Sequence, residues 1–317
     1  MPFTTYLGHW LSHIRGRVRL STYEGYRMLL QCHAIPALGE IELGRLHPLD
    51  IQSLYGQLLS PERQPRPLSA GSVRNLHLVL AQALKQAVSW QLIDRSPASG
   101  AQPPRPRPHQ YTVADPVLLR MLLDQLVGHP LELPAAFAIA TGMRRGELLA
   151  LRWSDLSPDH SIAYIRRSLQ ITRQGLCFEE PKTRRSRRAI ILPALIHPYL
   201  ERQEAAQQSR RSGSSTAPRD ALIIDRGDGQ PINPDSLSSA WRRFIRGNEL
   251  PAIRFHDLRH SHATALLLQG VHPKIVSERL GHASIGITLD TYSHVLPTMQ
   301  SDAVTAFDEL FATAQTS

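Results

Sequence analysis

The segment Ser99-Gly-Ala-Gln-Pro-Pro-Arg-Pro-Arg-Pro-His-Gln110 divides this chain of 317 residues into two parts. Its four prolines prevent a regular helix and favour extended backbone, which is typical of a linker. Because domains commonly contain roughly 100–200 residues, a chain of this length has room for two. We predict one domain over 1–102, the linker over 103–112 and a second domain over 113–317.

The part before the linker carries apolar residues at helical spacing. One stripe runs from Tyr23 to His33, and we expect Pro36 and Gly39 to end its helix. Two further stripes predict two more helices, and their members are Ile51, Leu54, Leu58 and Leu59, then Val73, Leu76, Leu80, Leu84 and Val88. The first domain is therefore predicted to be all-helical, with these stripes as its core.

The part after the linker mixes helical and alternating patterns. Helical spacing covers 115–127, 131–140, 144–153 and the region from Ser236 onward. Short runs rich in Ile, Tyr and Phe predict strands at 161–168, 176–180 and 188–192. The segments between these elements include a polar turn at Thr183–Arg187 and a surface loop over 205–219. We predict a mainly α protein with a small antiparallel β-sheet, in which the second domain is α+β.

The charge of the chain favours a polyanionic partner. Lys and Arg number 36 against 27 Asp and Glu, a net charge of +9. Residues 1–110 carry 12 basic and 6 acidic side chains and residues 111–317 carry 24 and 21, so both parts are positive. Arginine predominates, and its planar fork suits phosphate. The lysines are Lys85, Lys182 and Lys274.

Several classes of protein are disfavoured by composition. Cys32 and Cys177 do not make a disulfide framework, and no C-x-x-C pair suggests zinc. No apolar run reaches the roughly 18 residues of a membrane helix. Met1–Trp10 lacks the apolar core of a secretory signal. We therefore expect a cytoplasmic protein without a membrane partner.

The stretch Thr141-Gly-Met-Arg-Arg-Gly-Glu-Leu-Leu149 is the first candidate for chemistry. Gly142 permits a sharp turn, and a helix that starts after it places Arg144 near a helix N-terminus, where anions bind. Glu147 is three residues further on and can orient Arg144. The alternative is an exposed ion pair between the two residues.

A second candidate lies in the charged run from Glu180 to Arg188, where six of nine residues are charged. Such runs are usually solvated, which is the alternative for most of this one. Lys182 differs, because lysine can give up a proton and arginine effectively cannot. We interpret Lys182 as a candidate proton donor.

The third candidate is His256-Asp-Leu-Arg-His-Ser-His262. His256 and Arg259 share one face of a helix, and a titratable imidazole beside a fixed cation suits proton transfer next to a phosphate. Metal binding by His256 and His260 is an alternative, but the stretch lacks a familiar ligand frame such as H-E-x-x-H. The other alternative is a set of plain surface histidines.

The last candidate runs from Leu280-Gly-His282 to Tyr292. Taken alone, Pro273–Tyr292 has the pattern of a helix-turn-helix with Ile275, Val276, Leu280 and Ile285 in its core. Taken alone, Tyr292 is most often a core aromatic residue with a hydrated hydroxyl.

Together, and in this order, the four stretches resemble the tyrosine recombinase, or phage integrase, family. The similarity extends over about 20–295 and includes T-G-x-R-x-x-E, H-D-L-R-H and L-G-H followed ten residues later by tyrosine. It implies a SAM-like core-binding domain over 1–102 and a catalytic integrase domain over 113–317. It also implies these catalytic residues: Arg144, Lys182, His256, Arg259, His282 and Tyr292, with Glu147 supporting Arg144.

The resemblance implies cleavage and rejoining of DNA strands through a 3′-phosphotyrosyl intermediate. Tyr292 is then the nucleophile, and Arg144 and Arg259 stabilise the charge that develops on the phosphate. His256 is the candidate acceptor of the tyrosine proton and Lys182 the candidate donor to the leaving 5′ oxygen. In this family arginine side chains take the place of the metal cations that other phosphoryl-transfer enzymes use, so no metal or other cofactor is expected.

The expected partners are double-stranded DNA and, on paired recombination sites, three further copies of the chain in a homotetramer. Two alternatives remain open at this level. A type IB topoisomerase has the same chemistry but relaxes supercoils, and a DNA-binding regulator would use the 273–292 helices without catalysis. The regulator has no need of Lys182 or Arg144.

Overall fold

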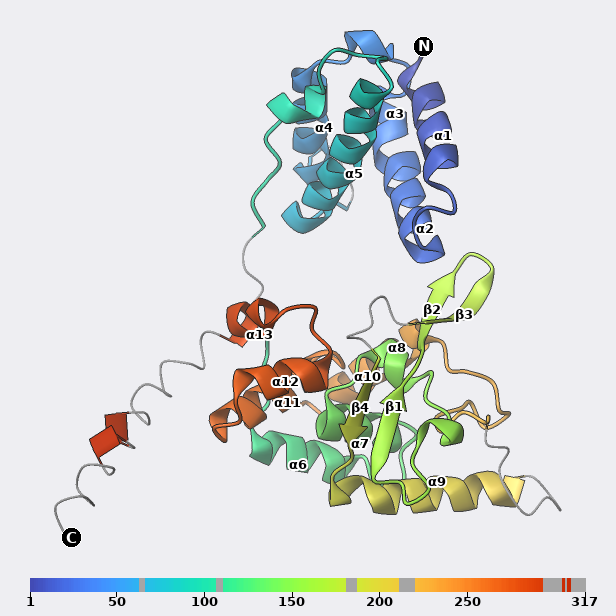
Figure 1. Ribbon diagram of the computed structural model, residues 1–317, viewed down its shortest axis with the longest axis vertical. Coiled ribbons are helices and arrows are strands. Elements are labelled where there is room, and N and C mark those ends of the chain that lie inside the picture. Colours follow the sequence, from blue (N-terminus) through green and yellow to red (C-terminus); the bar gives the residue numbers. More distant parts are fainter. Residues whose placement is uncertain are drawn as a thin grey trace. The chain divides into compact units, whose positions relative to one another are not determined.

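The computed structural model describes residues 1–62, 66–106, 111–180, 187–210 and 220–292, with four further positions at 304–305 and 307–308. The chain separates into two compact units, Met1–Gln110 and Tyr111–Ser317 (Figure 1). Each unit has its own hydrophobic core. The described residues are mostly helical with small antiparallel sheets in the second unit, which confirms the predicted fold class.

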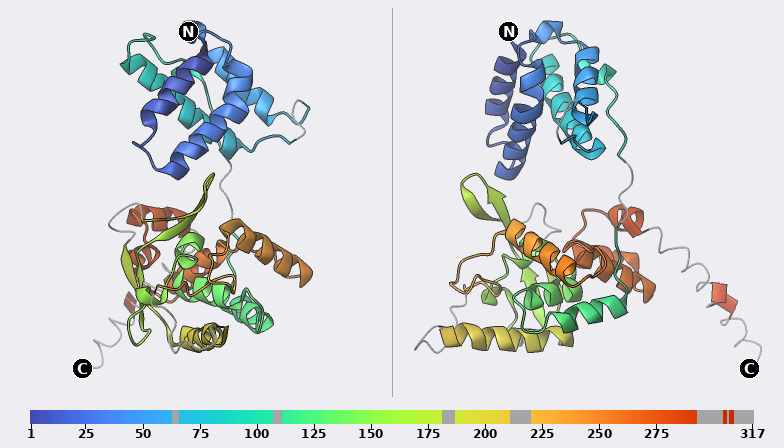
Figure 2. Two further views of the ribbon diagram at one scale, coloured as in Figure 1. Left: turned by 90° about the vertical axis from the view of Figure 1, so that its right-hand side faces the viewer. Right: turned by 180° about the vertical axis from the view of Figure 1, so that it is seen from behind.

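The first unit is a bundle of helices around one apolar core. Its helices are α1 (Phe3–Ile14), α2 (Leu20–Leu29), α3 (Ile35–Leu38), α4 (Pro48–Leu59) and α5 (Ala70–Ser89). The predicted stripes of α4 and α5 face inward, and Ile51, Leu76 and Leu80 are fully buried. The N-cap of α5 is Ser69, whose Oγ accepts the N–H of Ser72 at 3.1 Å. Figure 2 shows the same bundle from two other sides.

One expectation for this unit is wrong, because Pro36 does not end its helix. After α2 the backbone makes a π-helical turn over Leu30–Ala34 and continues as α3 to Leu38, where Gly39 follows. Proline in a regular helix clashes with the carbonyl four residues earlier and lacks a donor. A π-helical turn changes the hydrogen-bond pairing just before the ring, which lets the chain stay helical.

The second unit packs its helices around α7. Its helices are α6 (Pro116–Gln125), α7 (Glu132–Thr141), α8 (Arg145–Leu148), α9 (His197–Arg210), α10 (Pro234–Gly247), α11 (Asp257–Leu268), α12 (Pro273–Leu280) and α13 (Ile285–Tyr292). All residues from Pro134 to Thr141 are buried, and α11 packs along α7. A helix that is apolar on every side belongs in the centre of a domain, and α6, α8, α9 and α11 pack against α7.

The strands of the second unit form two antiparallel pairs. β1 (Ile162–Ile165) pairs with β4 (Arg188–Ile191), with Ile162 opposite Ile191. β2 (Ser168–Thr172) pairs with β3 (Gly175–Glu179), with Ser168 opposite Glu179. The β2–β3 hairpin projects from the unit, at the end opposite α9 (Figures 1 and 2).

The structure also corrects three predicted boundaries. The helix expected over 144–153 stops at Leu148, because Leu151 and Trp153 pair with the backbone of 221–223 instead. The strand expected over 161–168 is two strands that pair with different partners. The surface loop expected from 205 starts later, since α9 continues to Arg210. Residues 211–219, and 183–186 of the predicted polar turn, lie outside the described residues.

Within the described residues, no helix combines the length and the apolar character required to cross a bilayer.

Candidate active site

Two helix ends meet at the buried guanidinium of Arg259. α7 ends at Gly142 and α12 ends at Gly281, both in the left-handed conformation with φ of 65° and 68°. Arg259 donates from Nη1 to the carbonyl of Gly142 at 2.6 Å and from Nη2 to the carbonyl of Leu280 at 2.8 Å. Carbonyls at a helix C-terminus carry partial negative charge. They therefore hold this cation in one orientation although it is only 3% exposed.

Arg144 reaches the same place from the start of α8. Its Nη2 donates to the carbonyl of Gly281 at 2.9 Å, and its Nη1 donates to Oε1 of Glu147 at 2.9 Å. The backbone N–H of Arg144 donates to Oε2 of Glu147 at 2.9 Å, so one carboxylate fixes both the side chain and the helix start. The ion pair predicted from the spacing is thus half-buried and not a surface feature.

Arg188, at the start of β4, completes this group and is missing from the predicted site. Its Nη2 donates to Oε2 of Glu147 at 2.9 Å, and its Nε donates to the carbonyl of Arg279 at 2.6 Å. The charged run from 180 to 188 hides this residue in the sequence. Strand alternation could have found it, because Arg188 shares a strand face with Ile190, which is buried.

The site carries more positive than negative charge, since Arg144, Arg188 and Arg259 gather near the one carboxylate of Glu147. The pKa of Glu147 falls to about 2, because hydrogen bonds and charges from Arg188 and Arg144 outweigh the effect of burial. Burial, followed by the neighbouring charge of Arg144, lowers the pKa of Arg259 to about 9, which leaves the group charged at neutral pH. Three guanidiniums around one carboxylate are suited to hold a phosphate.

Two predicted histidines lie beside these cations. His282 follows Gly281, and its Nδ1 is 2.8 Å from Oγ1 of the buried Thr288. Burial, with the charges of Arg259 and Arg144, lowers the pKa of His282 to about 4. His256 is the N-cap of α11 and is exposed. Desolvation, followed by the charge of Arg259, lowers its pKa as well. Both rings are therefore neutral at pH 7.

Tyr292 ends α13 and lies in a small apolar cluster, with a ring that is 2% exposed. Its hydroxyl is 3.0 Å from Nδ1 of His260. Burial raises the pKa of Tyr292 to about 12, although the charge of Arg259 acts in the opposite direction. The phenol is therefore protonated in this structure and close enough to Arg259 to sense its charge.

Of the four core residues expected for a helix-turn-helix over 273–292, two are buried and two are exposed. Val276 and Leu280 are fully buried with Tyr292 as predicted. Ile275 is 56% exposed and Ile285 is 37% exposed, so their expected place in that core is wrong. The buried positions match a contact with α11, which packs against α12.

Two further charged residues near the site in sequence are Lys182 and Arg145. Lys182 lies outside the described residues. Arg145, adjacent to Arg144, turns away and binds the start of α10: its Nη1 is 2.8 Å from the carbonyl of Pro234 and 3.3 Å from Oδ1 of Asp235. The structure therefore places Arg144, and not Arg145, at the cation cluster.

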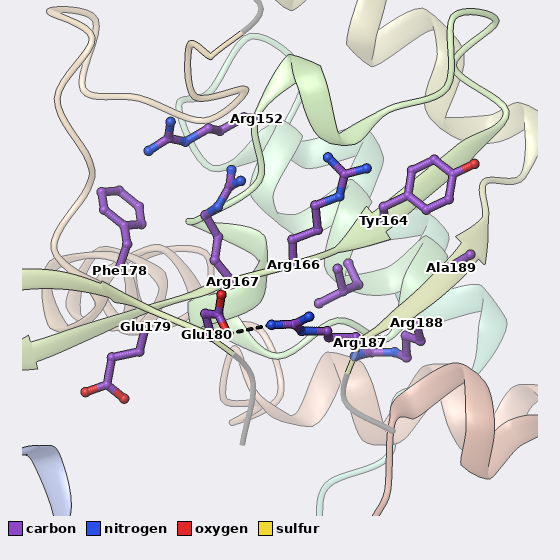
Figure 3. A pocket seen from close by; sticks show the side chains of 11 residues that line it. Arg152, Tyr164, Arg166, Arg167, Phe178, Glu179, Glu180, Arg187, Arg188 and Ala189 are labelled. Atoms are coloured by element: carbon purple, nitrogen blue, oxygen red, sulfur yellow. Dashed lines mark hydrogen bonds and ion pairs between the residues drawn. The ribbon is translucent and has the colours of Figure 1, made fainter. Parts of the chain in front are cut away.

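A basic cleft of about 610 Å³ opens beside the site, between β1, β3 and β4 (Figure 3). Arg152, Arg166 and Arg167 extend from its wall on one side of β1. Arg167 pairs with the buried Asp155 at 2.9 Å, and Arg152 stacks over the ring of Phe178. Arg188 lines this cleft and also contacts Glu147, so the cleft is continuous with the cation cluster.

In the part of the chain that the structure describes, no three His, Cys, Asp or Glu side chains gather as metal ligands. His256 and His260, the alternative pair, place their rings at right angles with centroids 5.1 Å apart.

Substitution of Gly142 tests how much its close packing against His262 and Leu280 contributes to stability. A Cβ at Gly142 falls 2.7 Å from both His262 and Leu280 and requires a positive φ. Overpacking costs about 1–3 kcal/mol and the left-handed conformation about 1 kcal/mol more. We expect Gly142→Ala to lower the free energy of unfolding by about 3 kcal/mol in urea denaturation.

Gly128 provides the matched control for that substitution. It has a φ of 75° but no atom within 4 Å of an added Cβ. Gly128→Ala should cost only the conformational part, about 1 kcal/mol. Equal losses for the two variants would show that packing at Gly142 contributes nothing.

Comparison with known families assigns both units. The model described as "Phage integrase family" matches residues 124–299, more than half of the chain. The model described as "Phage integrase, N-terminal SAM-like domain" matches residues 2–59.

Two curated relatives illustrate the sequence similarity. The chain is 26% identical over 290 residues to a tyrosine recombinase XerC-like protein of Caldanaerobacter subterraneus subsp. tengcongensis, covering 86% of this chain and 73% of the relative. It is 26% identical over 245 residues to the ICEBs1 integrase of Bacillus subtilis, covering 77% and 67%.

Solved structures show the same fold. The Tn1549 transposon integrase in complex with a circular intermediate DNA superposes with a TM-score of 0.78 at 20% identity, covering 92% of this chain and 95% of that one. A lambda integrase dimer bound to a COC' core site gives a TM-score of 0.70 at 16% identity, covering 92% and 95%. A lambda integrase tetramer bound to a Holliday junction gives 0.67 at 18% identity, covering 90% and 78%.

Proposed function

The chain belongs to the phage integrase family and is a site-specific tyrosine recombinase, and we propose that it cuts and rejoins DNA through Tyr292. The phenolic oxygen attacks the phosphorus of one strand, the bond from phosphorus to the 5′ oxygen breaks, and the protein is left joined to the 3′ phosphate. A 5′ hydroxyl of another strand then attacks the phosphotyrosine and releases Tyr292. Because the ester bond is exchanged and not hydrolysed, no external energy source is required.

Arg144 and Arg259 form the phosphate site in this proposal. Attack adds negative charge to the non-bridging oxygens, and preorganised donors stabilise that charge without reorganising. The carbonyls of Gly142, Leu280 and Gly281 hold the two guanidiniums before the substrate arrives. The single observation that carries the proposal is that backbone carbonyls hold both guanidiniums in place, with Tyr292 close enough to Arg259 for its pKa to respond to that charge. His282, oriented by Thr288, adds a further hydrogen bond.

The proton transfers are assigned to His256 and Lys182. His256 is neutral at pH 7, so it has a lone pair available for the proton that leaves Tyr292. Lys182 gives a proton to the departing 5′ oxygen. Glu147 holds Arg144 and Arg188 in place and takes no proton itself, since its pKa is about 2.

We assign DNA binding to both parts of the chain, with 1–102 as the SAM-like core-binding domain, 103–112 as the linker and 113–317 as the catalytic domain. The basic cleft at Arg152, Arg166 and Arg167 supports a phosphate contact of the DNA backbone next to the cut strand. Affinity should fall steeply with salt, because such contacts release counterions. By analogy with the lambda integrase tetramer, four copies act on paired sites. We expect the reaction to take place in the cytoplasm.

The test is a covalent adduct. Fragments of the source organism's genomic DNA are incubated with the full chain in EDTA, and DNA that stays attached in SDS is sequenced. The captured sequence is then built into a nicked suicide duplex, from which the cleaved end diffuses away. We expect an SDS-resistant adduct without added metal. A salt-sensitive gel shift without any adduct would instead indicate a DNA-binding regulator.

Replacement of Lys182 tests the donor role. Lys182→Ala should lower the cleavage rate of the suicide duplex by about 10²–10⁴-fold, the usual contribution of general acid catalysis. A duplex with sulfur in place of the leaving 5′ oxygen needs little protonation, so the variant should cleave it at nearly the wild-type rate. If the variant stays slow on the sulfur-containing duplex, Lys182 is not the acid.

A further inference from the structure

His260 is the residue that contacts the Tyr292 hydroxyl in this structure, at 3.0 Å from Nδ1. It has no role in the proposed mechanism. Its ring is 7% exposed, and it comes from α11, whereas Tyr292 comes from α13. The two residues are separated by 32 positions, so the tertiary structure creates this contact.

Both partners of this hydrogen bond are neutral at pH 7, and the tautomer of His260 decides its direction. Burial, followed by the nearby His256, lowers the pKa of His260 to about 4, so the ring is neutral at pH 7. The pKa of Tyr292 is raised to about 12, so the phenol keeps its proton. With the proton on Nε2 of His260 the tyrosine O–H donates to Nδ1, and with the proton on Nδ1 the phenolic oxygen accepts; the contact at 3.0 Å exists in both cases.

Aromatic neighbours fix the orientation of the His260 ring. Tyr111 covers one face, with ring centroids 3.9 Å apart and planes 34° from parallel. His256 packs edge-on, with centroids 5.1 Å apart and planes at 87°. Because the ring is held from two sides, its Nδ1 lies at a defined place.

We propose that His260, held by Tyr111, is a positioning residue that directs the hydroxyl of Tyr292 for attack. This inference rests on the proposed function of Tyr292. The hydrogen bond ties the phenolic oxygen of Tyr292 to the ring of His260, so the attacking oxygen is already held in place when the phosphate enters. Misplacement of a reacting atom by about 1 Å can cost roughly 10²-fold in rate.

Two substitutions at His260 separate positioning from packing. The side-chain amide of asparagine falls near the place of Nδ1 and can accept or donate a hydrogen bond there, whereas the amide of glutamine reaches the place of Nε2. On the suicide duplex at saturating protein, we expect His260→Gln to cleave about 10–100-fold more slowly. His260→Asn should stay within about threefold of the wild type, and the dissociation constant for DNA should be unchanged in both.

His77 supplies a matched control in the first unit. Its Nδ1 is 2.8 Å from the hydroxyl of Tyr55, so the first unit contains the same pair of groups. His77→Gln should therefore leave the cleavage rate unchanged. Equal loss of activity in the Asn and Gln variants of His260, or no loss in either, would overturn the proposal.

Two further measurements keep the inference testable if cleavage is absent or a His260 variant fails to fold. In protein labelled with 3-fluorotyrosine, the ¹⁹F signal that disappears in Tyr292→Phe should shift in His260→Gln; an unmoved signal would contradict the contact. Tyr111→Phe should cleave like the wild type, while Tyr111→Ala should slow cleavage without weakening DNA binding. If Tyr111→Ala cleaves normally, the stacked ring has no positioning role. Failure of the proposed function itself would appear differently, as a wild type that forms no adduct.

Discussion

Tyr292→Phe is expected to abolish the covalent protein–DNA adduct on the suicide duplex while DNA binding stays at the wild-type level. The substitution removes one oxygen, and that oxygen is the atom that joins the phosphate in the proposed reaction. The phosphate contacts proposed for Arg144 and Arg259 do not involve this oxygen, so the gel-shift affinity and its salt dependence should not change. The adduct is measured by SDS gel electrophoresis of labelled duplex.

The control for this variant is Tyr55→Phe. Tyr55 is 1% exposed and its hydroxyl contacts Nδ1 of His77, so the substitution removes a similar buried Tyr–His hydrogen bond. Each loss should cost about 1 kcal/mol of stability. Tyr55→Phe should form adduct at the wild-type rate. A persistent adduct in Tyr292→Phe would refute the assignment of the nucleophile.

Arg259→Lys is expected to lower the cleavage rate by about 10²–10³-fold although the charge is conserved. The planar guanidinium bridges the carbonyls of Gly142 and Leu280 at 2.6 and 2.8 Å and can still direct N–H groups at a phosphate. An ammonium group is a single point on a flexible stem and cannot meet both carbonyls and the phosphate in the same geometry. Affinity for DNA should change little, because the net charge is the same.

Arg145→Lys is the matched control for that substitution. Arg145 is close in sequence to the site, but its guanidinium binds the start of α10. Partly exposed pairs of this kind contribute little, so the cleavage rate should stay within about threefold. If both lysine variants lose activity equally, the caging of Arg259 is not the cause.

Much of the architecture could be predicted from local patterns. The apolar stripes of α4 and α5 are visible because burial of one helix face repeats every three to four residues. The short strands were recognisable by alternation, but their pairing was not. β2 pairs with β3 through a tight turn, whereas β1 pairs with β4, which is distant in sequence. The helix expected over 144–153 failed because backbone pairing with 221–223 outweighs helical preference there.

For the site, the sequence shows which residue types are present and in what order, but it does not show their hydrogen-bond partners. The spacing of Arg144 and Glu147 predicted their ion pair, which the structure contains. Arg188 and His260 were hidden, because a charged run and a histidine-rich stretch look like solvated surface. Their roles arise from contacts over 41 and 32 positions, which no local pattern encodes.

The sequence by itself determined the two-part organisation, the excess of arginine and the presence of a tyrosine nucleophile candidate with its cations, since these depend on residue identity and spacing. Only the tertiary structure decided that the ends of α7 and α12 meet at Arg259 and that Tyr292 is buried against His260. The physical reason is that the carbonyls at a helix end can hold a cation only if the fold brings a charged side chain against them, as it does with Arg259. The neighbour across the fold is set by packing of the whole core, not by the residues next to it in the chain.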